Sequence, residues 1–178
     1  MFGQGRRFHT IETPRLVLKP VSPEDVPALV SGIGNYDVVR WLGRVPYPSR
    51  AADAEAFVAR GLASDRAEDV WVMDGAAHGL SEVLGLVGLE RMDREQSEVG
   101  YWVAPALWNT GLASEAVQAV VAANPHRSKT LFAEVFQDNP ASAHVLTNAG
   151  FDYIGDAEAF SVARNAKVPT WTYIRKMA

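Results

Sequence analysis

The sequence predicts an α+β fold built on one mixed β-sheet. Three short β-rich runs in the middle of the chain, separated by turn-forming residues, predict an antiparallel meander. A strand, helix, strand, helix succession follows, and two runs near the end predict a closing antiparallel pair of strands. With 178 residues, 48% apolar and 21% charged, the chain has the size and composition of one globular domain, which we assign to residues 1–178.

The first third of the chain predicts a strand and two helices. Residues 15–20 form a short apolar run that a proline stops, and Ser22-Pro23-Glu24-Asp25 has the order of a helix start. The first helix is expected to turn Val26, Leu29, Val30 and Ile33 inward. A second helix is expected after Ser49, where Ala52, Ala56, Phe57, Ala59 and Leu62 recur at helical spacing.

The later elements follow from the same periodicities and from turn residues. Strands are expected at residues 70–73, 83–89, 99–103, 130–136, 151–154 and 170–175, and helices at residues 111–123 and 140–149. Gly150 stands just past the last helix, where glycine commonly ends one.

Composition excludes several classes of protein. The 17 basic and 21 acidic side chains give a net charge of -4, so no basic field favours nucleic acid as a partner. The absence of cysteine excludes disulfides, thiolate metal sites and a cysteine nucleophile, and the histidines lack metal-ligand spacing, so no metal is expected. No apolar run is long enough to cross a bilayer, and we expect a cytoplasmic protein that does not act at a membrane.

The most informative stretch runs from Glu98 to Ala116, where a strand passes through a short turn into a helix. The first turn of that helix has amide groups without partners, and Gly111, Ala113 and Ser114 leave them uncovered by large side chains. Such a helix start can hold a pyrophosphate. An ordinary strand-to-helix connection, capped by Asn109 or Ser114, explains the same residues equally well.

A second stretch begins at Asn139, which has the position of a helix cap at the end of a strand. Pro140 follows at the first helical position, and Ser142 lies within the first turn. Asparagine is a favoured cap whatever the function of a protein, so this stretch alone indicates only a helix.

Together, the two stretches resemble the GNAT superfamily of acetyltransferases, and more narrowly its Rim-type branch of ribosomal-protein N-terminal acetyltransferases and their relatives. The resemblance covers nearly the whole chain. It includes the opening Glu12-Thr13-Pro14-Arg15-Leu16-Val17-Leu18, the aromatic loop with Trp41-Leu42 and Tyr47-Pro48, and the strand from Glu98 to Trp102. It continues through residues 108–116, residues 139–142 and Gly150-Phe151.

The resemblance implies a mostly antiparallel sheet with helices on both faces, in which a central parallel strand pair splays apart around the pantetheine arm of acetyl-coenzyme A. It implies that Val103 offers backbone groups to the pantetheine and that Asn139 binds the same arm. The pyrophosphate would be held by Gly111, Leu112, Ala113 and Ser114. Ser142 is the candidate donor to the departing thiolate. The chain departs from the family where Asn109 and Thr110 replace a usual glycine and basic residue.

The implied reaction is transfer of an acetyl group to a primary amine, on a peptide N-terminus or a small molecule, by direct attack. Glu98 is the carboxylate that the motif places beside the thioester, and we assign it as the base, acting directly or through water. Trp41 and Tyr47 are candidates to line the acceptor groove, and loops at residues 40–49 and 156–169 are expected to set specificity.

Two other functions fit parts of the pattern. A non-catalytic module of the same fold that senses acyl-coenzyme A would keep Gly111 and Asn139, but Glu98 and Ser142 favour an enzyme. An unrelated mononucleotide-binding domain is disfavoured because the chain has neither a phosphate-loop lysine nor the full dinucleotide glycine fingerprint. Whether the protein is a monomer or a homodimer stays open.

Overall fold

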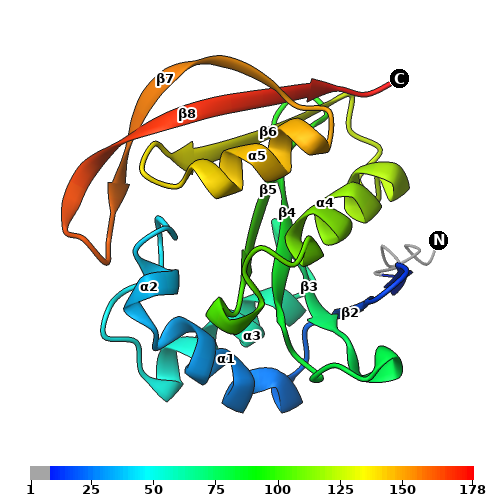
Figure 1. Ribbon diagram of the computed structural model, residues 1–178, viewed down its shortest axis with the longest axis vertical. Coiled ribbons are helices and arrows are strands. Elements are labelled where there is room, and N and C mark those ends of the chain that lie inside the picture. The colour runs from blue at the N-terminus through cyan, green and yellow to red at the C-terminus, as the bar shows by residue number, and fades with distance from the viewer. Residues whose placement is uncertain (1–8) are drawn as a thin grey trace.

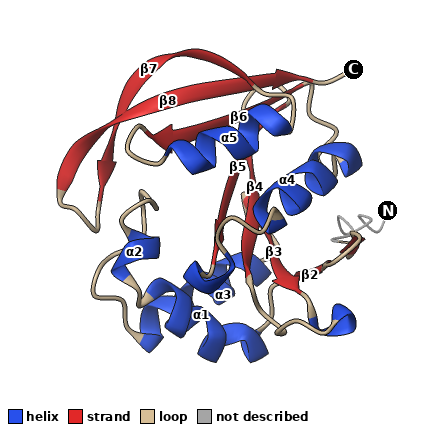
Figure 2. Ribbon diagram, viewed as in Figure 1, coloured by secondary structure: helices blue, strands red, loops and turns tan. Residues whose placement is uncertain are grey.

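The computed structural model describes residues 9–178 and is organised around one eight-stranded sheet (Figures 1 and 2). The strands lie in the order β1-β2-β3-β4-β5-β6-β8-β7. Their bounds are β1 Ile11–Glu12, β2 Val17–Pro20, β3 Glu68–Asp74, β4 Gly85–Met92, β5 Gln96–Val103, β6 Thr130–Phe136, β7 Asp152–Ser161 and β8 Ala166–Lys176. The α-helices are α1 Val26–Ile33, α2 Tyr36–Val39, α3 Ala51–Leu62, α4 Leu112–Ala123 and α5 Pro140–Asn148.

The sheet is mixed because one pair of neighbouring strands, β5 and β6, runs parallel, whereas the other pairs are antiparallel. The parallel pair is joined only at its start, where residues 96–98 of β5 face residues 130–132 of β6. Beyond these residues the two strands have no paired positions. Figure 1 shows β6, β8 and β7 turning away from β4 and β5. The predicted fold class and the splayed parallel pair are confirmed.

Helices cover both faces of the sheet and enclose two apolar cores. On one face α4 and α5 pack through residues such as Val117 and Leu146 against the inward side chains of the central strands. On the other face, α1, α2 and α3 contribute Leu29, Val39 and Val58 to a second core. Because side chains alternate along a strand, β5 presents successive residues to the two cores in turn.

Most expected elements occur close to their predicted positions. The first helix begins with a 3-10 turn at Pro23–Asp25, and the expected helix after Ser49 is α3. The buried residues of α3 are Ala54, Val58 and Gly61. Ala52, Ala56 and Ala59 are exposed, so their spacing identified the helix but not its buried face.

The end of the chain differs from the expected pattern. The strands β7 and β8 extend far beyond residues 151–154 and 170–175, and the stretch 156–169 is mostly a β-hairpin arm rather than a loop. The arm is largely exposed, so its sequence lacks the alternation of apolar and polar residues that marks a half-buried strand. Within residues 9–178, no helix combines the length and apolar character needed to cross a membrane.

Candidate active site

A cavity of about 1560 Å³ lies where β5 and β6 diverge. It is lined by the end of β5, the start of α4, the end of β6 and the start of α5, together with the loop after α2. Two strands that separate cannot satisfy each other's backbone groups, so this part of the sheet exposes backbone toward the cavity. The cavity therefore combines free backbone groups with the N-terminal ends of two helices.

The start of α4 is an open cradle of amide groups. Gly111, the N-cap residue, is left-handed with φ of 80°, and no side-chain cap hydrogen bond was found there among the described residues. Asn109, two residues earlier, is also left-handed with φ of 62°. Asparagine adopts this conformation more readily than most residues, so the loop keeps its turn without the usual glycine. Residues 111–114 line the cavity, and the first amides of a helix have no partner within the helix.

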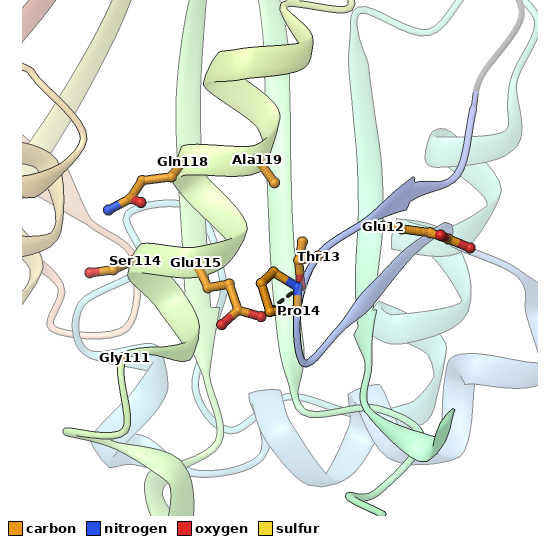
Figure 3. Close-up of a pocket in the computed structure, with 8 residues that line it drawn as sticks. All are labelled: Glu12, Thr13, Pro14, Gly111, Ser114, Glu115, Gln118 and Ala119. Atoms are coloured by element: carbon orange, nitrogen blue, oxygen red, sulfur yellow. Dashed lines mark hydrogen bonds between the residues drawn. The ribbon is translucent and has the colours of Figure 1, made fainter. Parts of the chain in front are cut away.

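Arg15, which lies far away in sequence, brings a positive charge to this loop. Its Nη1 donates to the Thr110 carbonyl at 2.9 Å and its Nε to Glu115 Oε1 at 2.9 Å. Figure 3 shows Glu115 also accepting a hydrogen bond from Thr13, beside Gly111. Burial raises the pKa of Glu115, but hydrogen bonds from Thr13 and Arg15 lower it overall, so the carboxylate stays ionised and holds Arg15 in place.

The start of α5 is joined to β5 by a pair of hydroxyl groups. Asn139 caps the helix, its Oδ1 accepting from the Ser142 amide at 3.4 Å. The Ser142 hydroxyl donates to Tyr101 Oη at 2.9 Å, and Tyr101 Oη donates to the Ser142 carbonyl at 2.7 Å. Burial raises the pKa of Tyr101, so its phenol keeps its proton. Tyr101 thus links the two walls of the cavity.

Glu98 lies on the opposite face of β5 from Tyr101, beside Gly100 and Trp102, and lines the same cavity. Burial raises the pKa of Glu98, repulsion from Glu90 and Glu134 adds to the rise, and Arg44 opposes it. A carboxylate with a raised pKa is a better proton acceptor near neutral pH. The site therefore has a hydroxyl pair on one face of β5 and a candidate base on the other.

A protein-family model described as "Acetyltransferase (GNAT) domain" matches residues 15–152, more than three quarters of the chain. The chain belongs to the GNAT acetyltransferase family. The matched region of this GNAT chain runs from the β1–β2 turn to the start of β7 and includes most residues that line the cavity, whereas the lining residues Ala159, Phe160 and Thr170 lie beyond it.

Similar proteins agree with that assignment. The uncharacterized N-acetyltransferase YoaA of Bacillus subtilis (strain 168) is 27% identical over 155 residues, which cover 83% of this GNAT chain and 85% of YoaA. A Salmonella typhimurium acetyl transferase that modifies the N-terminal serine of ribosomal protein L7/L12 has a TM-score of 0.80 at 16% identity, covering 96% of this chain and 100% of that one. The microcin C7 self-immunity acetyltransferase MccE, in complex with acetyl-CoA and AMP, has a TM-score of 0.79 at 12% identity. The match covers 92% of this chain and 93% of MccE. At these identities the structural likeness shows the fold alone.

The GNAT fold gathers most of the residues selected from the sequence around one cavity. The lining residues among them are Trp41, Glu98, Val103, Gly111, Leu112, Ala113, Ser114, Asn139 and Ser142. Tyr47 does not line it; this side chain is 47% exposed and packs edge-on against Tyr36. The Val103 carbonyl already accepts a hydrogen bond from the Trp108 indole at 2.8 Å, so it is partly engaged within the chain.

Sequence reasoning assigned no role to three residues that lie in or beside this cavity. Arg15 and Tyr101 lie within motifs that the sequence singled out, but their partners are far away in the chain. Glu68, at the start of β3, lines the cavity from a strand to which no function was assigned. An ionisable residue at the edge of a predicted strand was the only signal that could have pointed to it.

Proposed function

We propose that this GNAT protein is an N-acetyltransferase that moves the acetyl group of acetyl-coenzyme A directly onto a primary amine, on a peptide N-terminus or a small molecule. The single observation that carries the proposal is the cradle of uncovered amides at the start of α4, open to the cavity between β5 and β6. Helix N-termini of this kind favour phosphate groups.

The coenzyme side of the site fits such a donor. In this proposal the amides of residues 111–114 and the Arg15 guanidinium hold the pyrophosphate, and Val103 and Asn139 bind the pantetheine arm. When bound, acetyl-coenzyme A supplies an activated acyl group as a thioester. The Ser142 hydroxyl is already hydrogen-bonded to Tyr101, on the face of β5 opposite Glu98. It is proposed to stabilise the departing thiolate.

In this proposal the acceptor amine loses a proton on the side of the cavity that contains Glu98. The neutral amine nitrogen bonds to the acetyl carbon as the carbon–sulfur bond breaks, one proton of the amine passes to Glu98 directly or through water, and the thiolate takes up a proton. An α-amine with a pKa near 7.8 costs about 1.1 kcal/mol to deprotonate at pH 7, against about 4.6 kcal/mol for a lysine near 10.4. The raised pKa of Glu98 suits the base for either acceptor.

The branch of the family, the extent of the domain and the cellular location are parts of the same proposal. We assign the chain to the Rim-type branch on the basis of its opening residues 12–18 and the strand from Glu98 to Trp102. The structural likeness to the Salmonella ribosomal-protein acetyltransferase agrees with that choice. The proposal also takes residues 1–178 as one domain and places the protein in the cytoplasm.

The proposal is tested by two measurements on the full chain. Calorimetric titration should show saturable uptake of acetyl-coenzyme A, and a thiol assay should show release of coenzyme A when amines are added. Uptake without release over a broad amine panel would instead favour the sensing module. Absence of uptake would overturn the proposed function altogether.

A further inference from the structure

Carboxylates gather on the acceptor face of the sheet, across neighbouring strands. Glu68 of β3 faces Glu90 of β4, which in turn faces Glu98 of β5. Arg44 forms an ion pair with Glu90 at 2.5 Å. Within residues 9–178 the side-chain carboxylates of Glu68 and Glu98 have no hydrogen bond or ion pair, although both residues pair through their backbones in the sheet. Two carboxylates therefore line the cavity without a direct counterion.

Two glycines make room between these carboxylates. Gly88 of β4 and Gly100 of β5 are paired, on the same face as Glu68 and Glu98. A β-carbon added to Gly88 would clash with the Glu68 carboxylate, so the carboxylate leans over Gly88 toward β5. A β-carbon added to Gly100 would meet nothing within 4 Å. Glu68 and Glu98 thus border one open space above Gly100.

The electrostatics of this space favour a bound cation. Burial raises the pKa of Glu68, repulsion from Glu90 and Glu98 adds to the rise, and Arg44 and Arg60 oppose it. Burial and repulsion from Glu90 also raise the pKa of Glu98, and Arg44 opposes that rise. A positive charge placed between two carboxylates relieves that repulsion. The cavity is lined by four carboxylates and two arginines: Asp53, Glu68, Glu98 and Glu134 against Arg44 and Arg60. Arg44 is already paired with Glu90.

An unsatisfied hydroxyl group provides independent evidence that the cavity accepts a polar ligand. Thr170 of β8 lines the cavity and is only 1% exposed, and its Oγ1 has no hydrogen-bond partner among residues 9–178. Buried hydroxyls are nearly always hydrogen-bonded, because an unpaired one costs about 1 to 3 kcal/mol. A polar ligand in the cavity can supply the missing partner.

The tip of the β7–β8 hairpin limits the size of that ligand. The Val162 amide donates to the Gly43 carbonyl at 3.0 Å, and Arg164 Nε donates to the Arg40 carbonyl at 2.7 Å. Arg164 also pairs with Asp138 at 2.6 Å. Figure 1 shows the hairpin arm coming down beside the loop that follows α2. These contacts bridge the rim of the cavity, which favours a small acceptor over a folded protein chain.

We propose that the acceptor is a short aliphatic diamine or a longer amine of the same dicationic kind. One amine is presented to Glu98 for acetylation, while a second, still protonated, occupies the space above Gly100 and pairs with Glu68. This inference rests on the proposed function and narrows its substrate class. Glu68 is then a residue that determines specificity, because it touches the part of the acceptor that does not react.

The test compares butane-1,4-diamine with butylamine, which has the same chain length and one amine fewer. We expect kcat/KM for the diamine to exceed that for butylamine by about tenfold or more, the factor typical of one hydrogen bond to a charged group. Glu68→Gln should lower kcat/KM for the diamine about tenfold more than for butylamine. Calorimetry in the presence of coenzyme A should show a matching loss of diamine affinity.

Glu55→Gln is the matched control, because Glu55 is exposed on α3 and does not line the cavity. This control should leave the diamine preference and the diamine affinity unchanged, and both variants should bind coenzyme A as the wild type does. Equal rates for the two amines, or a preference that survives Glu68→Gln, would overturn the diamine assignment and leave the proposed function standing. If acetyl-coenzyme A does not bind the wild type, or no amine is acetylated, the proposed function fails and this inference falls with it.

Discussion

Ser142 and Tyr101 form the smallest unit on which the proposed chemistry depends. The Ser142 hydroxyl donates to Tyr101 Oη, and Tyr101 donates to the Ser142 carbonyl. Loss of the Ser142 hydroxyl leaves the second bond in place, so the two walls of the cavity should stay joined. The hydroxyl is therefore a group whose chemical role can be separated from its structural one.

Ser142→Ala is expected to lower kcat by about 10- to 100-fold, the range that corresponds to one hydrogen bond to a charged group. The affinity for acetyl-coenzyme A should change little, because the hydroxyl acts mainly as charge builds on sulfur. Steady-state rates and calorimetric titration of the same variant separate the two effects. Equal losses in kcat and in affinity would argue for a binding role instead.

Glu98→Gln tests the assignment of the base through the pH profile. A base must be ionised to accept a proton, and the raised pKa of Glu98 places its ionisation above the usual glutamate range. The wild-type kcat/KM should therefore rise with pH through that higher pKa, in addition to the rise caused by deprotonation of the substrate's ammonium group. The Glu98→Gln variant should lose the part of the pH profile that reflects ionisation of Glu98. An unshifted profile would assign proton removal to solvent or to another group.

At the scale of elements, Asp69 connects β3 to the start of the parallel strand pair. This buried carboxylate pairs with Arg66 at 2.7 Å, with Arg91 at 3.2 Å and with His126 at 2.7 Å. The His126 Nδ1 lies 2.8 Å from Ser97 Oγ on β5. Ser97 is only 1% exposed, so this aspartate, histidine and serine series serves structure rather than catalysis. It fixes the end of the sheet from which β5 and β6 diverge.

The pH dependence of stability follows from the pKa of Asp69. Burial alone would raise it, but hydrogen bonds from His126 and Arg66 and the charge of Arg91 lower it to about 2. A lowered folded-state pKa stabilises the native state above the unfolded pKa of 3.8, and this stability is lost as pH falls from about 4 to about 2. The shift corresponds to about 2 kcal/mol. Urea unfolding of the wild type between pH 5 and pH 2 should show this loss.

Asp69→Asn should flatten that pH dependence and lower stability at neutral pH. Glu95→Gln provides a matched control, because the pair between Glu95 and Lys129 is mostly exposed and should contribute little. If Asp69→Asn shows the same pH dependence of stability as the wild type, the acid sensitivity belongs to other carboxylates.

Local sequence signals identified the elements that begin or end at clear capping residues and failed for the elements that lack them. Gly111 before α4 and Asn139-Pro140 at the start of α5 placed both helices to within a residue or two. The four-residue helix α2 was missed because one turn carries no periodicity. The extended hairpin was missed because neither face of its outer part is buried for long.

At the scale of the whole molecule, the position of the helix starts proposed for the coenzyme was easier to predict than the grouping of the carboxylates on the other side of the cavity. Most residues proposed to bind the coenzyme lie at the starts of two helices, where each local sequence specifies its own backbone geometry. The cavity-lining carboxylates Glu68, Glu98 and Glu134 come from three strands. Their proximity depends on strand order and on register, and a shift by one residue would turn each side chain to the opposite face. A single sequence does not specify that register.

Binding of acetyl-coenzyme A between β5 and β6 should also stabilise the whole fold, because the ligand joins two parts of the sheet that diverge. At a concentration about 100 times its Kd, a ligand that binds only the native state adds about 2.7 kcal/mol. For a chain of this length, that corresponds to a rise in Tm of roughly 5 to 11 °C. Thermal unfolding at increasing acetyl-coenzyme A measures the rise, with ATP as a control that shares the adenine and phosphates but lacks the pantetheine arm. An equal shift with ATP would mean that the gap between the strands contributes nothing to recognition.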